Sequence, residues 1–158
     1  MKAASVKQIK DELQHLSHAD LVNACLRLAK FKKENKELLS YLLFDAANEP
    51  GYINEVKKHL LEEFKTVNLK SVYITKKNLR RIVKLANRFI KYSDDPETPV
   101  QILLFLCQEM QSLPVNFSRS VSLANILAAT KNKLLKHIET LHEDLQYEYK
   151  RSFQKLND

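Results

Sequence analysis

The chain has 158 residues, a formal net charge of +7, a single glycine and no tryptophan. This length suits one domain with a core of its own, and the scarcity of glycine excludes an architecture built on tight β-hairpins. No segment is long and apolar enough to span a membrane, and the first residues, MKAASVKQIKDELQ, lack the apolar region of a secretory signal. These features predict a cytoplasmic helical protein that occupies residues 1–158 as one domain.

The first third of the chain predicts three amphipathic helices. Ser5 and Gln8 have the spacing of a capping box, and a second cap lies between Ser17 and Asp20. The charged run at residues 32–36 interrupts the apolar pattern and predicts a break before a third helix. The expected apolar faces consist of Val6, Ile9, Leu13 and Leu16, then Leu21, Cys25, Leu28 and Phe31, and finally Leu38, Leu39, Leu42, Leu43 and Ala46.

The middle of the chain predicts two further helices. Residues 48–51 form the clearest loop, with the only glycine and with a proline suited to a helix start. The helix after it places Ile53, Val56, Leu60 and Phe64 on one face. We expect residues 66–74 to form an extended connector, and Thr75 to cap a basic helix over about residues 76–92.

The last third predicts one buried helix and a long helical stretch. Thr98 and Gln101 have capping-box spacing, and the helix they open is apolar nearly all round, which predicts deep burial. Leu113 and Pro114 end it. Residues 118–156 form either one helix or two with a break near residue 140. The prediction is therefore an all-α fold with seven or eight antiparallel helices, arranged as a HEAT-like short solenoid or as an irregular bundle.

The charge is concentrated in one segment. Nine basic residues and no acidic residue lie between Lys65 and Ser93, whereas 17 basic and 19 acidic residues lie outside this segment. On a helical wheel, six of the nine fall within an arc of about 100°. We call this set the basic stripe; it consists of Lys77, Arg80, Arg81, Lys84, Arg88 and Lys91.

The basic stripe is either an ordinary solvated helix face or a binding surface for a polyanion. Its neighbours at i,i+3 and i,i+4 carry like charges, and each such pair costs about 0.2–0.5 kcal/mol at low salt. Acidic neighbours in the fold or an external anion can offset this cost. The acidic candidates are Glu55, Glu62 and Glu63, and two aromatic residues that flank the stripe, Tyr73 and Tyr92, can stack on bases.

The sequence carries no recognisable catalytic motif, phosphate-binding glycine loop or cofactor signature. Both cysteines, Cys25 and Cys107, lie among apolar residues, which predicts buried reduced thiols. Two E-x-x-H motifs, Glu12 with His15 and Glu139 with His142, have the spacing of di-iron ligands. A di-iron enzyme, with Glu109 as a further ligand, is thus a distant alternative to two solvated helix ends.

Three stretches together, LVNACLRLAKFKKENKELLSYLL, LRRIVKLANRFIKYS and VQILLFLCQEM, resemble an uncharacterised family of small bacterial all-helical proteins. The resemblance covers most of the chain and lies in layout and residue type. It implies a helical fold and a bacterial cytoplasmic setting, and it implies no activity and no functional residues. The chain departs from the family at its C-terminal end, where residues 141–144 replace a Gly-Trp-Gly-like turn.

The sequence therefore predicts a binding module without catalytic residues, cofactor or metal. Its first partner class is nucleic acid, contacted at the phosphates by the basic stripe without reading of the base sequence. The alternative partner is an acidic protein segment. Lipid ranks lower, because the face opposite the stripe is fully used by the core and leaves no apolar wedge for a bilayer.

Overall fold

The computed structural model describes residues 2–157 and shows an all-α protein. Eight α-helices, one π-helical turn and one 3-10 turn account for its regular structure, and there is no strand among the described residues. The predicted fold class is confirmed. The chain divides into two compact units, Met1–Phe44 and Asp45–Asp158, which we call the N-terminal and C-terminal units. That residues 1–158 behave as one domain stays a prediction.

The N-terminal unit contains three helices: α1 (Val6–Leu13), α2 (His18–Phe31) and α3 (Lys33–Ser40). The capping box is present as predicted, since Ser5 Oγ accepts from the Gln8 backbone N–H while the Gln8 side chain accepts from Ser5. Ser17 caps α2 by accepting from the Asp20 N–H at 3.1 Å. Lys32 takes an extended conformation between α2 and α3, which confirms the predicted break. The turn η1 (Tyr41–Asp45) follows α3.

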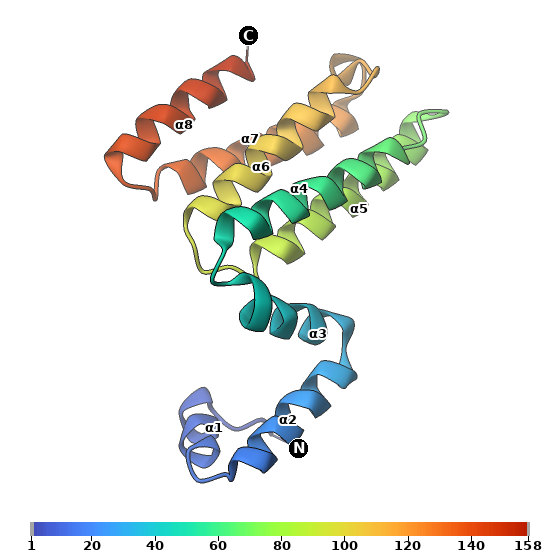
Figure 1. Cartoon of the computed structure of the whole chain (residues 1–158). Helices are drawn as coiled ribbons and strands as arrows, with labels where there is room; N and C mark the ends of the chain where they lie inside the picture. The colour runs from blue at the N-terminus through green and yellow to red at the C-terminus, as the bar shows by residue number, and fades with distance from the viewer. Residues whose placement is uncertain (1, 158) are drawn as a thin grey trace. The chain divides into compact units, whose positions relative to one another are not determined.

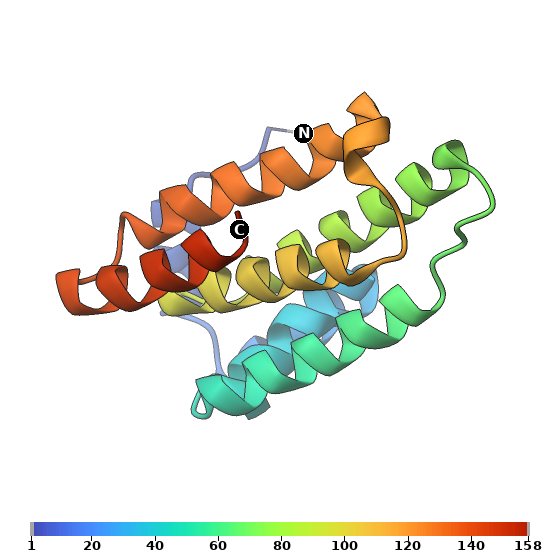
Figure 2. The same ribbon diagram turned by 90° about the horizontal axis from the view of Figure 1, so that it is seen from above.

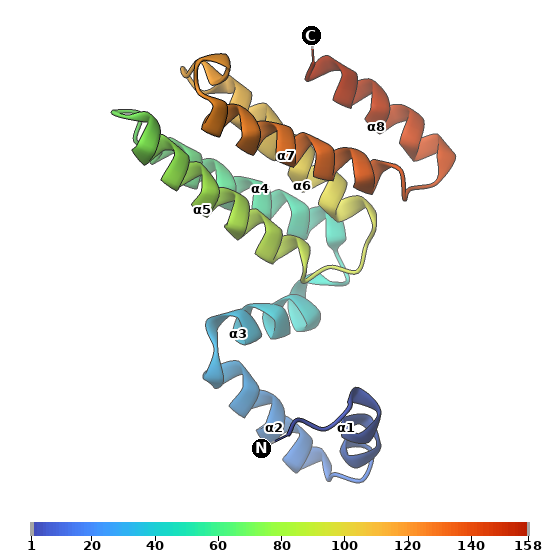
Figure 3. The ribbon, with the colours of Figure 1, turned by 180° about the vertical axis from the view of Figure 1, so that it is seen from behind.

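The C-terminal unit contains α4 (Glu49–Lys65), α5 (Val72–Ile90), α6 (Glu97–Ser112), α7 (Val121–Ile138) and α8 (Glu143–Lys155), with η2 (Phe117–Arg119) before α7. Views from opposite sides show α4 and α6 in one layer and α5 and α7 in the other (Figures 1 and 3). Successive helices are neighbours, and α6 packs against α4, α5 and α7. Within this unit the helix pairs stack as they do in a short solenoid.

Helix α6 forms the centre of the core, as its apolar sequence predicts. Its buried side chains include Val100, Ile102, Leu103, Leu106, Cys107 and Met110, all at most 1% exposed. From the flanking helices, Leu60, Leu79, Ile82, Leu123 and Leu134 are also fully buried. The view from above shows helices α4 to α8 lying side by side, with α6 between its neighbours (Figure 2).

Local boundaries differ from the prediction at four places. Residues 72–74 belong to α5, because Ser71 Oγ caps that helix at the Ile74 N–H, so the extended connector is shorter than predicted. Thr75 is instead buried inside α5 and donates to the Ser71 carbonyl. No capping box forms at residues 98–101, since Pro96 occupies the N-cap of α6 and the Thr98 hydroxyl donates to Glu49.

The expected loop at residues 48–51 is shorter than predicted, because Pro50 and Gly51 already belong to the first turn of α4. The Asn48 side chain caps this helix by accepting from the Gly51 N–H at 3.2 Å. A Cβ at position 51 would lie 2.4 Å from Nδ2 of the Asn48 side chain, so any other residue there would displace the capping side chain. The long C-terminal stretch forms two helices, α7 and α8, separated near residue 140.

Candidate nucleic-acid interface

The basic stripe lies on the outer face of α5. The opposite face of this helix carries the buried Leu79, Ile82, Ala86 and Ile90, as predicted. Because that apolar face packs into the core, the stripe is directed away from it. Five of its members are exposed and Arg88 is half-buried, so the predicted solvated cationic face exists.

One of the acidic candidates reaches the stripe. Glu63 Oε2 on α4 lies 2.5 Å from Arg81 Nη1, and the two side chains are 24% and 52% exposed. This salt bridge neutralises the middle of the stripe. The other two candidates pair on their own helix, Glu55 with Lys58 and Glu62 with Lys65, each at 2.6 Å.

Four members of the stripe carry uncompensated charge. Within residues 2–157, Lys77, Arg80, Lys84 and Lys91 make no salt bridge. The Arg88 guanidinium carbon lies 5.6 Å from the centre of the Phe89 ring, a cation–π distance that holds it against the helix surface. Internal neutralisation therefore reaches Arg81 but leaves Lys77, Arg80, Lys84 and Lys91 uncompensated.

Helix α7 adds positive charge beside the stripe, which the linear sequence did not reveal. Lys133 on α7 donates a hydrogen bond to Asn87 Oδ1 on α5, so its ammonium group lies at the junction of these two helices. Desolvation lowers the pKa of Lys133, and the positive charge of Lys91 lowers it further. Burial likewise lowers the pKa of His137 one helical turn along, with a further contribution from Lys133. Lys91 and Lys133 therefore form a cationic pair across α5 and α7, beside His137, whose lowered pKa favours its neutral form.

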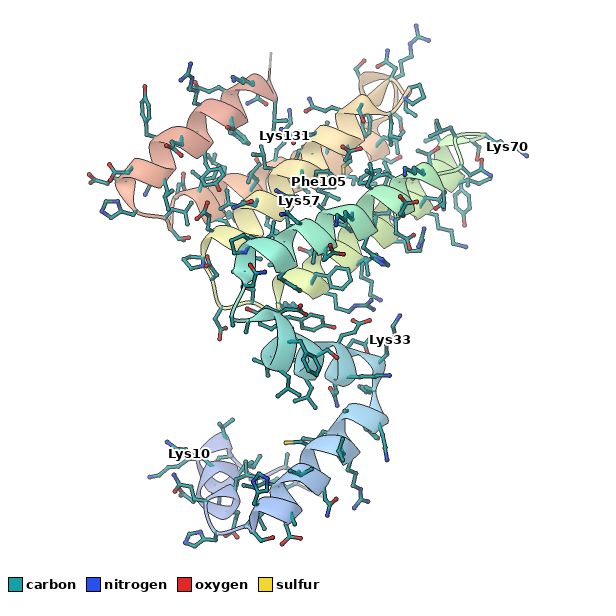
Figure 4. All side chains as sticks on the ribbon, viewed as in Figure 1. Lys10, Lys33, Lys57, Lys70, Phe105 and Lys131 are labelled. Carbon is teal, nitrogen blue, oxygen red and sulfur yellow. The ribbon has the colours of Figure 1, made fainter. Side chains whose placement is uncertain are left out.

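The sequence signal for Lys133 was weak. It lies 42 positions after Lys91 in a helix of mixed composition, and only the packing of α5 against α7 brings the two together. Lys131 is directed toward the end of α8, where it donates to the Leu156 carbonyl oxygen at 2.7 Å; Figure 4 labels this side chain and Lys57.

The two flanking aromatic residues have different environments. Tyr73 is 69% exposed, and the Lys76 ammonium lies 5.8 Å from the centre of its ring. Tyr92 is 8% exposed and packs edge-on against Phe89. The expectation that both can stack on bases is therefore wrong for Tyr92, whose ring faces are used by the core.

The side chains considered for chemistry do not assemble into a site. Cys107 is fully buried, and burial raises the pKa of its thiol to about 12, whereas Cys25 is exposed, which corrects the prediction that both thiols are buried. The two E-x-x-H motifs belong to different units, and Glu12, His15, Glu139 and His142 are all exposed. Across residues 2–157, no three His, Cys, Asp or Glu side chains are placed to hold a metal ion. The di-iron alternative is therefore not supported.

A second polar network lies on the other side of the unit. Tyr149 on α8 donates to Glu97 Oε1, and the Gln101 amide donates to the same carboxylate at 3.2 Å. Lys57 on α4 donates to Gln101 Oε1, also at 3.2 Å. Burial and the Glu97 carboxylate raise the pKa of Tyr149, so this phenol stays protonated. The network joins α4, α6 and α8, and its groups satisfy one another.

No protein-family model, curated protein or solved structure matches this chain. The resemblance to a family of small bacterial helical proteins accordingly stays a prediction. Nor does any helix within residues 2–157 combine the length and the apolar character needed to cross a membrane.

Proposed function

We propose that the C-terminal unit binds nucleic acid through phosphate contacts made by the basic stripe, without reading the base sequence. The observation that carries this proposal is the uncompensated charge of Lys77, Arg80, Lys84 and Lys91 along one exposed helix face. A row of cations held at the spacing of helical turns attracts a polyanion whose charges are also regularly spaced.

Helix α7 widens this surface. Lys133 contributes a further cation from a second helix, at the point where Lys91 ends α5. Because Lys91 and Lys133 repel each other, a phosphate placed near both relieves repulsion as well as gaining attraction. The interface so formed has width as well as length, which suits a nucleic-acid backbone better than a single narrow stripe does.

Phosphate contacts fit this surface better than base readout does. The stripe offers lysine and arginine side chains on a rigid helix, and of the two predicted stacking residues only Tyr73 is exposed. Proteins that bind single strands by stacking present several aromatic faces along the groove. Binding should therefore be dominated by electrostatics and should tolerate sequence changes in the nucleic acid.

The test is the salt dependence of binding to duplex DNA and RNA of mixed sequence. With about four to six phosphate contacts, the slope of log K against log salt should be about −4 to −5. A triple variant carrying Arg80→Ala, Lys84→Ala and Lys91→Ala should bind weakly. Its slope should be shallower by about 1 for each phosphate that no longer meets a cation.

A matched control removes the same charge elsewhere. Lys58, Lys150 and Lys155 are exposed and lie on α4 and α8. Their combined change to alanine alters the net charge equally, and it should leave most of the affinity and the slope intact. Equal weakening in the two triple variants would show that net charge alone drives binding and would contradict the proposed site. An acidic protein that the unchanged chain retains from a nuclease-treated lysate, and that the stripe variant does not retain, would support the alternative partner.

A further inference from the structure

The N-terminal unit has almost no core of its own. Of residues 2–44, Tyr41 alone is buried, and every residue from 2 to 20 is exposed. Nevertheless α1, α2 and α3 have the apolar stripes that the sequence predicts for core-facing helices. Twelve large apolar side chains of this unit are exposed, and we call them the N-terminal apolar set: Val6, Ile9, Leu13, Leu16, Val22, Leu26, Leu28, Phe31, Leu38, Leu42, Leu43 and Phe44.

Helices whose apolar faces are exposed in this way need another surface that buries those faces whenever the helices are folded. Helices α1 and α3 have eight residues each. In water, isolated helices shorter than about 12–15 residues are marginal, and helical stability in proteins comes mainly from the packing of an apolar face. Local caps such as the Ser5–Gln8 box stabilise by about 1 kcal/mol and do not replace that packing. The exposed stripes therefore mark an interface on which the order of these helices depends.

The area of the N-terminal apolar set fits a dimer. Half-exposed on average, these twelve side chains together leave on the order of 1,000 Å² of apolar surface, distributed over α1, α2, α3 and the turn η1. A stable protein–protein interface takes about 800 Å² from each partner. One copy of this surface thus supplies the area that one side of a stable interface requires.

The charges around the set suit a second copy of the same chain. Helix α1 carries Lys7, Lys10, Asp11 and Glu12 beside its apolar positions, so both signs border the surface. In a two-fold symmetric dimer the same patch meets itself, and a border of mixed sign can pair with its own copy, whereas a border of one sign repels it. A second copy is also the partner that is present whenever the chain is made.

We infer that the N-terminal unit is a homodimerisation element in which the N-terminal apolar set of one copy covers that of another. Burial of the set explains why short, exposed helices carry continuous apolar stripes. This inference does not depend on nucleic-acid binding, since it concerns the other unit.

The first test is the mass of the full chain in solution, measured by light scattering and sedimentation over a dilution series. We expect a dimer that dissociates on dilution. Leu28, on α2, is 61% exposed, and Leu28→Glu places a charge within the interface, so this variant should be a monomer at concentrations where the unchanged chain is dimeric. Tyr147→Glu, at a 74% exposed position on α8, is the matched control and should stay dimeric.

Cys25 offers a second measurement on the unchanged protein, independent of whether any variant folds. This thiol is exposed on α2 among members of the set, whereas Cys107 is buried and serves as the unreactive reference. When the protein concentration is raised about 100-fold above the dissociation constant, labelling of Cys25 by a maleimide should slow roughly tenfold, because less than a tenth of the chains are then monomers.

The dimer is supported when the mass doubles and Cys25 becomes protected over the same concentration range. A monomer at all concentrations overturns it, including a monomer with a protected Cys25, which would mean that the set is covered within one chain. A dimer that survives Leu28→Glu while Cys25 stays reactive overturns it as well, because the two copies then meet elsewhere.

Discussion

The salt bridge between Arg81 and Glu63 makes the energetics of the basic stripe measurable. Arg81→Ala removes this attraction, which for a pair exposed by 52% and 24% is worth about 0.2–1 kcal/mol. The same change also relieves repulsion from Lys77 and Lys84, at i−4 and i+3, worth about 0.2–0.5 kcal/mol each. The two effects oppose each other, so Arg81→Ala should change the free energy of unfolding by less than about 1 kcal/mol, within a range from a loss of about 0.6 to a gain of about 0.8 kcal/mol.

Glu63→Ala should behave differently, because it removes only the attraction and leaves the repulsion. We expect it to lower the free energy of unfolding by about 0.2–1 kcal/mol, and so to cost more than Arg81→Ala. A double-mutant cycle by urea denaturation isolates the coupling between the two side chains. The coupling should shrink toward zero in 1 M salt, where the Debye length is about 3 Å.

Two results would refute this reasoning. A coupling indistinguishable from zero at low salt would mean that Glu63 does not neutralise the stripe, and Arg81 would then join the four uncompensated cations. A destabilisation by Arg81→Ala larger than that by Glu63→Ala would mean that the like-charge repulsion along α5 is negligible. The second outcome would also weaken the argument for an anionic ligand, because that argument depends on the cost of assembling these charges.

Three further changes test other parts of the structure. Leu106→Ala, at a fully buried position of α6, should lower the free energy of unfolding by about 2–5 kcal/mol in chemical denaturation, since it leaves a cavity in the core. Tyr149→Phe removes the hydrogen bond to Glu97 and should cost about 0.5–1.5 kcal/mol in the same assay; no change would show that this hydrogen bond does not stabilise the packing of α8. Lys133→Gln should weaken nucleic-acid binding. It should also leave the free energy of unfolding at neutral pH unchanged or higher. A lysine whose pKa is lowered in the folded state destabilises that state at every pH below its unfolded pKa, where the lysine of the unfolded chain is charged.

Local sequence determined the helices of this protein and the cationic face of α5. Capping residues such as Ser5 and Ser17 and the period of the apolar residues identify helices because these interactions lie within four positions along the chain. The same periodicity placed the basic stripe opposite a buried face. The errors at residues 72–74 and at Thr98 have different origins. The local cap of Ser71 at the Ile74 N–H starts α5 early, whereas the Thr98 hydroxyl donates to Glu49 on another helix.

Tertiary structure decided which charges are compensated and which apolar faces are buried. Glu63 reaches Arg81, and Lys133 reaches Asn87, because helices pack side by side, and their separations of 18 and 46 positions leave no trace in local patterns. The stripes of α1 and α6 both satisfy the rule for a buried helix, yet all of α1 is exposed and α6 lies in the centre of a core. An apolar stripe shows that one face of a helix has to be buried against another surface. Whether a helix of the same unit buries that face depends on how the other helices pack.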